Sequence, residues 1–300
     1  MVAPFDAQPE DFECPACGAP KSRFKPLAQD QVEPPLPAGA LKGMGTPIVL
    51  TLAEKEVLSS DTRRFRFSLP VADAPLGLPV GNHVTLCFTD ATGAEVKRPY
   101  TPVTGPDARG YVDLVVKVYP ANTNPKFPAG GAMTQHLEAL PIGGTVSAEG
   151  PGGRIVYEGR GVLAVKDYTT GTTEKRAAKA LAMIAGGSGI TPMLALIRSI
   201  FSDPGDTTRV SLLYANQSPA DVLLRTELDS IAAAHPNFKV AYTVDRVPEG
   251  VAWPHTIGFV SGDMIAAALP PPTADVQFLL CGPPGMIKFA VQPAFDKSAL

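Results

Sequence analysis

The chain of 300 residues is 45% apolar and 18% charged, which is typical of a globular protein and leaves room for two domains with separate cores. Its formal net charge of −3 supplies no broad positive field, and this argues against nucleic acid as a partner. The sequence has neither an apolar run of the roughly 18 residues that span a membrane nor a signal peptide, so we expect a cytoplasmic protein without a membrane anchor in this chain.

The first 45 residues are rich in proline and have almost no apolar periodicity. We expect a small Cys-x-x-Cys knuckle in residues 1–25 and a proline-rich linker in residues 26–45. Two thiolates, Cys14 and Cys17, suit iron or zinc, but a tetrahedral site needs four ligands, so they form half a metal site. Cys87 lies in a strand-like apolar run of another domain and does not complete the site.

Residues 46–158 show short alternating strands between turn residues, most clearly at residues 111–119. This period-two pattern predicts a small antiparallel β-barrel. A helical stretch at residues 133–140 interrupts the strands. Two glycines just before it, Gly130 and Gly131, are suited to a phosphate at the helix N-terminus.

Three residues of the predicted barrel could bind a cofactor. Arg98 and Tyr100 lie together at a strand end, where the guanidinium can hold a pyrophosphate bidentately while the ring packs on a flavin. The alternative is an ordinary strand end. Lys117 alternates with apolar residues on another strand, so its ammonium either faces solvent or reaches a phosphate or carboxylate in a cofactor groove.

Residues 159–179 are polar and contain glycine, and we place a linker and the domain boundary there. In residues 180–300, apolar runs alternate with helical patterns. This alternation predicts a parallel sheet covered by helices, that is, an α/β nucleotide-binding domain.

A glycine-rich turn follows the first strand of that sheet. Gly187, Ser188 and Gly189 would let the backbone approach a phosphate, and Pro192 lies where a helix tolerates proline. A proline stands where the Rossmann fingerprint has its third glycine, so the turn is not that fingerprint. The alternative is a plain strand-to-helix turn.

Two further residues end strands of this sheet, where ligands of open parallel sheets bind. Cys281 is either placed against a nicotinamide or is a small buried cysteine. Asp245 would accept hydrogen bonds from an adenosine ribose diol and repel a 2′-phosphate, which favours NADH over NADPH; the alternative is a capping or surface aspartate. The four histidines, at positions 83, 136, 235 and 255, have no ligand spacing, so we interpret them as structural.

The motifs at residues 98–101, 186–192 and 281–284 occur about 90 residues apart, and together they indicate a flavin-to-nicotinamide electron carrier. With residues 131–134, they resemble the FAD and NADH motifs of the NADH–cytochrome b5 reductase family. The similarity covers roughly residues 46–293 and extends to the flavin module of eukaryotic nitrate reductase. The knuckle in residues 1–25 is similar instead to the second metal knuckle of rubredoxin.

The resemblance implies that one group of residues holds FAD in the barrel and another holds NADH on the parallel sheet. Thr101 and Cys281 are expected to serve the redox step, Thr101 through a hydrogen bond to the flavin nitrogen that accepts hydride. The expected cofactor residues are Arg98, Pro99, Tyr100, Thr101, Val115, Lys117, Tyr119, Phe127, Gly131, Ala132, Met133, Thr134, Gly187, Ser188, Gly189, Thr191, Pro192, Asp245, Cys281, Gly282, Pro283 and Met286.

Three residues depart from the family pattern. Ala132 replaces a basic residue often found there, Ser188 replaces a threonine and Gly285 replaces a third proline. The first change weakens a phosphate contact but leaves the backbone amides in place.

The resemblance therefore implies an FAD-dependent NADH reductase that passes hydride from NADH to FAD and then single electrons to a protein acceptor such as cytochrome b5. A nitrate reductase-like haem domain and a rubredoxin, which would add iron, are alternative acceptors. For the rubredoxin case, the missing thiolates would come from an upstream segment or another chain, unless the knuckle is a remnant. A non-catalytic nucleotide-binding scaffold is the alternative of a different class.

Overall fold

The computed structural model describes residues 39–298 except 106, 124 and 126, with side chains described as far as residue 295. These residues belong to one compact unit, Leu36–Leu300. Cys14 and Cys17 lie outside the described residues, and so do the knuckle and most of the linker predicted before residue 46. No described helix is long and apolar enough to cross a membrane.

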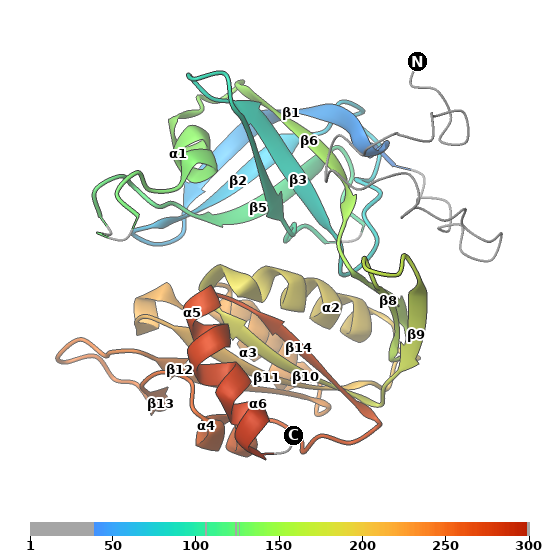
Figure 1. Ribbon diagram of the computed structural model, residues 1–300, viewed down its shortest axis with the longest axis vertical. Coiled ribbons are helices and arrows are strands. Elements are labelled where there is room, and N and C mark those ends of the chain that lie inside the picture. Colours follow the sequence, from blue (N-terminus) through green and yellow to red (C-terminus); the bar gives the residue numbers. More distant parts are fainter. Residues whose placement is uncertain (1–38, 106, 124, 126, 299–300) are drawn as a thin grey trace. The chain divides into compact units, whose positions relative to one another are not determined.

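The first part of this unit is a six-stranded antiparallel sheet (Figure 1) with the order β4-β3-β6-β1-β2-β5. The side chains of β2 alternate between the core and the surface: Phe65 and Phe67 are fully buried, while Arg64 and Arg66, which precede them, pair with carboxylates. With β4 and β5 as its edge strands, it is a curled half-barrel. The strands are β1 (Gly43–Val57), β2 (Thr62–Ser68), β3 (His83–Thr89), β4 (Glu95–Tyr100), β5 (Tyr111–Lys117) and β6 (Thr145–Gly152).

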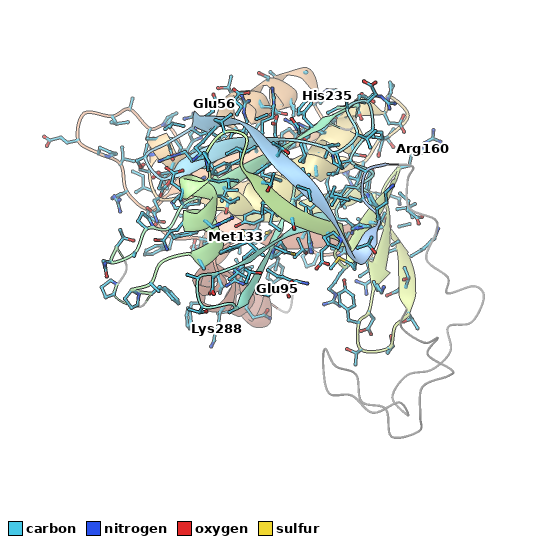
Figure 2. All side chains as sticks on the ribbon, turned by 90° about the horizontal axis from the view of Figure 1, so that it is seen from above. Glu56, Glu95, Met133, Arg160, His235 and Lys288 are labelled. Carbon is cyan, nitrogen blue, oxygen red and sulfur yellow. The ribbon has the colours of Figure 1, made fainter. Side chains whose placement is uncertain are left out.

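One helix, α1 (Ala132–Ala139), interrupts these strands where the sequence predicts it. The helix buries its Met133 side chain, which is 1% exposed. Figure 2 shows this buried methionine together with an exposed side chain for contrast, Lys288 near the end of the chain. The approach to the helix requires glycine, because Gly130 has φ +68° and a Cβ there would lie 2.5 Å from the carbonyl oxygen of Tyr119. The chain before α1 is thus held tightly against the end of β5.

A three-stranded antiparallel sheet follows, made of β7 (Ile155–Gly159), β8 (Val162–Lys166) and β9 (Thr173–Ala177). The predicted linker at residues 159–179 therefore contains two strands. The hydroxyl of Tyr157 fixes this sheet to the next part of the chain, because it donates to the Asp206 carboxylate and accepts from the amide of Gly161 at 2.8 Å.

The last part is a five-stranded parallel sheet with the order β13-β12-β11-β10-β14. Every residue of the inner strand β10 is buried, as expected for a parallel strand covered on both faces. The predicted α/β architecture is confirmed. Its strands are β10 (Ala180–Gly186), β11 (Arg209–Asn216), β12 (Phe238–Val244), β13 (Thr256–Ile257) and β14 (Val276–Cys281).

Helices cover both faces of this sheet (Figure 1). One core packs α2 and α3 against it and also includes Val103 and Val115 of the antiparallel part. A second core lies on the other face with residues of α4 and α6. Arg198 of α2 joins the two folds directly, because its guanidinium donates to the Val103 carbonyl and pairs with Glu227 at 2.6 Å. The helices are α2 (Ile190–Ser202), α3 (Arg225–Ala234), α4 (Gly262–Ala268), α5 (Pro284–Met286) and α6 (Gln292–Ser298).

Candidate active site

A cavity of about 1790 Å³ is lined both by β4, β5 and α1 of the antiparallel part and by the carboxyl ends of the parallel strands. Apart from Phe127, all the cofactor residues predicted from the sequence line it. The Phe127 side chain is 67% exposed and lies outside the lining. Since ligand pockets usually measure about 300–1,000 Å³, this cavity has room for two nucleotide cofactors.

At the end of β4, the motif predicted for flavin faces the cavity. Arg98 is exposed and donates to the Lys97 carbonyl at 2.7 Å, and it makes no ion pair with a described carboxylate. Its guanidinium is therefore available to an anion. Burial raises the pKa of Tyr100 to about 12, so this residue presents a neutral phenol ring.

The N-terminus of α1 forms a glycine cradle in the same wall. Thr134 Oγ1 donates to the Gly131 carbonyl at 3.1 Å and accepts from the amide of Tyr119 at 3.2 Å. A Cβ on Gly131 would collide with Thr134 Oγ1, so only glycine fits this turn. The helix leaves its first amides without helical partners, which suits a phosphate.

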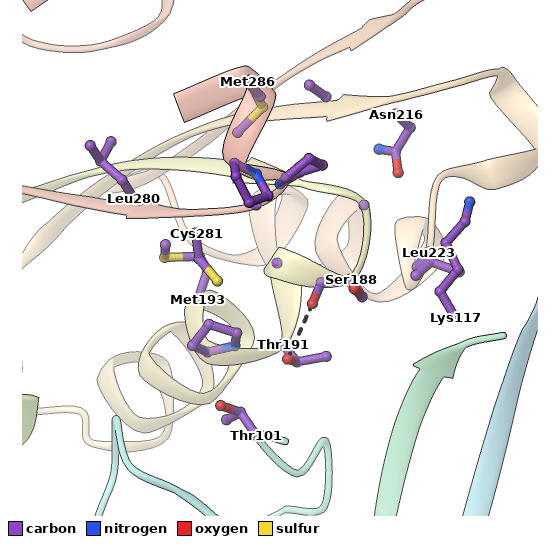
Figure 3. A pocket seen from close by; sticks show the side chains of 18 of the residues that line it. Thr101, Lys117, Ser188, Thr191, Met193, Asn216, Leu223, Leu280, Cys281 and Met286 are labelled. Carbon is purple, nitrogen blue, oxygen red and sulfur yellow. Dashed lines mark hydrogen bonds between the residues drawn. The ribbon is translucent and has the colours of Figure 1, made fainter. Parts of the chain in front are cut away.

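The turn after β10 forms a second cradle. Gly187 has φ +52°, with nothing within 4 Å of the position a Cβ would take, and the Tyr214 hydroxyl donates to its carbonyl at 3.0 Å. Thr191 Oγ1 donates to the Ser188 carbonyl at 3.2 Å (Figure 3). A Cβ on Gly189 would collide with the Cys281 carbonyl, so this glycine lets the turn lie directly against the end of β14.

Cys281 is a half-buried free thiol at the carboxyl end of β14. Burial raises its pKa, so the thiol stays protonated near neutral pH and is a poor nucleophile. Its place beside Gly189 and Gly282 suits contact with a flat ring. The sequence left a buried cysteine open as the alternative, and the structure places this cysteine in the cavity wall.

Asp245 follows β12 and also lines the cavity, with an exposed side chain. Its amide donates to the Asn216 carbonyl at 3.0 Å, which fixes the loop to the neighbouring strand. Burial raises the pKa of the carboxyl and the charge of Arg246 opposes that rise. An exposed carboxylate at this strand end is able to meet a ribose diol.

Lys117 at the end of β5 is not free in solvent. Its Nζ lies 2.5 Å from Asp61 Oδ2, and its side chain is 18% exposed. Burial alone would raise the pKa of Asp61, but hydrogen bonds from Lys117, Thr62 and Ser59 outweigh it and hold that pKa below its usual value. The carboxylate therefore holds the ammonium in the cavity wall.

Sequence reasoning missed Asp61, His83 and Asn216, which all line the cavity. His83, interpreted as structural, is half-buried, and burial lowers its pKa. Histidine without ligand spacing gives no signal in a single sequence, and neither does an aspartate in a turn. For Asn216, the sequence did hold a signal: it is a polar residue at the end of an apolar strand, and the neighbouring strands end at Gly186 and Val244, next to predicted site residues.

The cavity residues fit FAD and a nicotinamide nucleotide. The walls offer two glycine cradles for phosphates, an arginine without an ion-pair partner among the described carboxylates, and buried ring surfaces. In contrast, no group of three or more His, Cys, Asp or Glu side chains within the described ranges could hold a metal ion.

Comparison with known proteins agrees with this geometry. Residues 49–157 match the family model described as oxidoreductase FAD-binding domain, and residues 183–292 match oxidoreductase NAD-binding domain. NADH-cytochrome b5 reductase 2 of Xenopus laevis is 51% identical over 249 residues, which cover 83% of each chain. Human NADH-cytochrome b5 reductase 2 is 50% identical over 83% of this chain and 89% of its own length.

Among solved structures, the cytochrome b5 reductase domain of Ulva prolifera nitrate reductase is similar, with a TM-score of 0.78 and 41% identity. The match covers 88% of this chain and 97% of that one. Both resemblances inferred for residues 46–293 are confirmed. The chain therefore belongs to the NADH–cytochrome b5 reductase family and is an FAD- and NAD-dependent oxidoreductase.

Proposed function

We propose that this protein oxidises NADH with its FAD and passes single electrons to a cytochrome b5-type protein. The observation that carries the proposal is the single cavity lined by both glycine cradles, the Arg98 motif and Cys281. A nucleotide-binding scaffold would not need two cofactor sites that open into one space. The proposed division is an FAD-binding part at residues 46–158, a connecting segment at residues 159–179 and an NADH-binding part at residues 180–300; the family matches at residues 49–157 and 183–292 support it.

FAD, when bound, supplies the conversion between two-electron oxidation of NADH and one-electron transfer. In our proposal, Arg98 and the α1 N-terminus hold its pyrophosphate, Tyr100 packs on its ring and Thr101 donates a hydrogen bond to it. These residues bind and orient. The protein's contribution to catalysis is to hold two rings in contact with little further motion.

The second cradle would receive the phosphates of NADH at Gly187 and Gly189. Thr191 and Cys281 would then border the nicotinamide, with Cys281 as a neutral, compact contact rather than a nucleophile. Asp245 would accept hydrogen bonds from the adenosine ribose, and its charge would oppose a 2′-phosphate.

A nitrate reductase-type haem domain is a second candidate acceptor, favoured by the similarity to the Ulva reductase domain. A rubredoxin-type acceptor and bound iron depend on Cys14 and Cys17, which lie outside the described residues, and stay predictions. A reducing, cytoplasmic location is also still a prediction, in keeping with the free thiols of Cys87 and Cys281.

The acceptor is tested by mixing NADH-reduced protein with oxidised cytochrome b5 or rubredoxin and following the haem or iron absorbance. We expect fast reduction of cytochrome b5. Reduction of rubredoxin alone, or of neither protein while NADH still reduces the flavin, would contradict the proposed acceptor but not the reductase.

A further inference from the structure

Asn216 occupies the centre of the wall that would receive NADH. It is the last residue of β11, the strand between β10 and β12, and it pairs in register with Val244. On one side lies the turn that begins at Gly187, and on the other lies Asp245. The Asn216 side chain is therefore placed between the predicted phosphate site and the predicted ribose site.

The amide of Asn216 is buried without a hydrogen bond of normal geometry to any described residue. The residue is 7% exposed, and neither Oδ1 nor Nδ2 has a partner within the described part of the chain. The Asn216 side chain interacts with the nearby Tyr214 hydroxyl, but no hydrogen bond of normal length and angle joins the two, because that hydroxyl donates its proton to the Gly187 carbonyl, 3.0 Å away. Because buried polar groups in folded proteins almost always have partners, this amide calls for an explanation.

Asn216 belongs to the wall of the cavity, and its buried amide lies directly behind that wall. Asn216 is one of the residues that line the cavity, and Figure 3 shows it at the end of its strand on the side where Lys117 and Leu223 lie. A carboxamide offers both donors and an acceptor. Phosphate oxygens accept hydrogen bonds and ribose hydroxyls both donate and accept, so the adenosine diphosphate part of a dinucleotide matches it.

We propose that Asn216 is a binding residue for NADH whose amide hydrogen-bonds the adenosine diphosphate half, between the Gly187 turn and Asp245. The inference rests on the proposed function, since it takes NADH as the ligand of this wall. It explains why a strand end that is otherwise apolar, with Ala215 and Val244 as neighbours, carries a buried amide. Burial of this amide without a good hydrogen bond lowers the stability of the nucleotide-free protein. Hydrogen bonds to the nucleotide then compensate for this loss of stability.

The test compares FAD-loaded wild type with Asn216→Leu, a change of similar shape without polar atoms. Calorimetric titration with NAD⁺, ADP and nicotinamide mononucleotide should show about 10-fold weaker binding of NAD⁺ and ADP, as for lost hydrogen bonds to a charged ligand. Binding of the mononucleotide should stay within about 2-fold of wild type, since that half lies elsewhere on the wall. Asn216→Ala should give the same loss if leucine does not fit.

Thermal unfolding without nucleotide gives an independent readout. Asn216→Leu should raise Tm by about 2 °C or more, because it removes an unsatisfied buried amide. The matched control is Asn237→Leu at the amino ends of the parallel strands, where Nδ2 donates to the Thr208 carbonyl at 3.1 Å. The control should lower Tm and leave all three affinities unchanged.

The outcomes separate this inference from the proposed function. If wild type is reduced by NADH but Asn216→Leu binds NAD⁺ and ADP equally well, the role of Asn216 is refuted and the reductase stands. A lower Tm with unchanged affinities would likewise make Asn216 a structural residue. If wild type neither binds NAD⁺ nor is reduced by NADH, the proposed function itself fails.

Discussion

Arg98→Ala tests the flavin side of the cavity. Its guanidinium makes no ion pair with a described carboxylate, so its removal leaves no buried charge unpaired inside the protein. The substitution instead removes hydrogen bonds to the pyrophosphate of FAD and so lowers the affinity for FAD. Two charge-assisted hydrogen bonds contribute about 1.5–3 kcal/mol each; because Arg98 is exposed, we take the lower value, about 3 kcal/mol in total. This corresponds to about 100-fold weaker binding of FAD.

The assay is the ratio of flavin to protein after purification, followed by titration of the flavin-free protein with FAD. Arg98→Lys should bind FAD with intermediate affinity, because lysine keeps the charge but not the paired geometry. The control is Arg109→Ala, another exposed arginine of the same part of the chain, which donates to the Asp73 carbonyl at 3.2 Å. Full flavin content and unchanged FAD affinity in Arg98→Ala would refute the assignment.

Three further predictions concern single residues. Asp61→Asn removes the partner of Lys117. Because the pKa of Asp61 is depressed in the folded protein, its stabilisation is present above the unfolded pKa and lost as pH falls through the folded pKa. Urea titrations should therefore show a stability gap between wild type and variant at pH 7 that narrows at acid pH; a constant gap would refute the coupling. Asp245→Ser should reduce the preference for NADH over NADPH at least about 10-fold in kcat/KM, through loss of charge repulsion, and an unchanged ratio would contradict the ribose role. Gly285→Ala should raise the free energy of unfolding by about 0.5–1 kcal/mol, since a Cβ there meets nothing within 4 Å and the residue lies in α5; a destabilised variant would show that this turn needs glycine.

Local motifs explain why much of the site could be predicted. Residues 98–101 and 187–192 are short segments whose backbone conformation and side chains act together, so sequence order preserves their geometry. The covered strand β10 is likewise visible as an unbroken apolar run. Such features depend on neighbours along the chain.

The features that were missed depend on packing between distant segments. Asp61 meets Lys117 only because β2 pairs with β5 in register, and Asn216 borders the cavity only because β11 lies between β10 and β12. Strand β9 gave no signal because all of its residues, Thr173–Ala177, are exposed, so no apolar alternation marks it. Phe127 belongs to the flavin motif by resemblance, but its side chain is 67% exposed and is not part of the described cavity lining.

The central claim is that one cavity holds FAD and accepts NADH. The most direct measurement is the absorbance spectrum of the purified protein before and after anaerobic addition of NADH or NADPH. We expect a flavin spectrum that bleaches with NADH and much less readily with NADPH. A colourless protein that neither binds added FAD nor oxidises NADH would contradict the account.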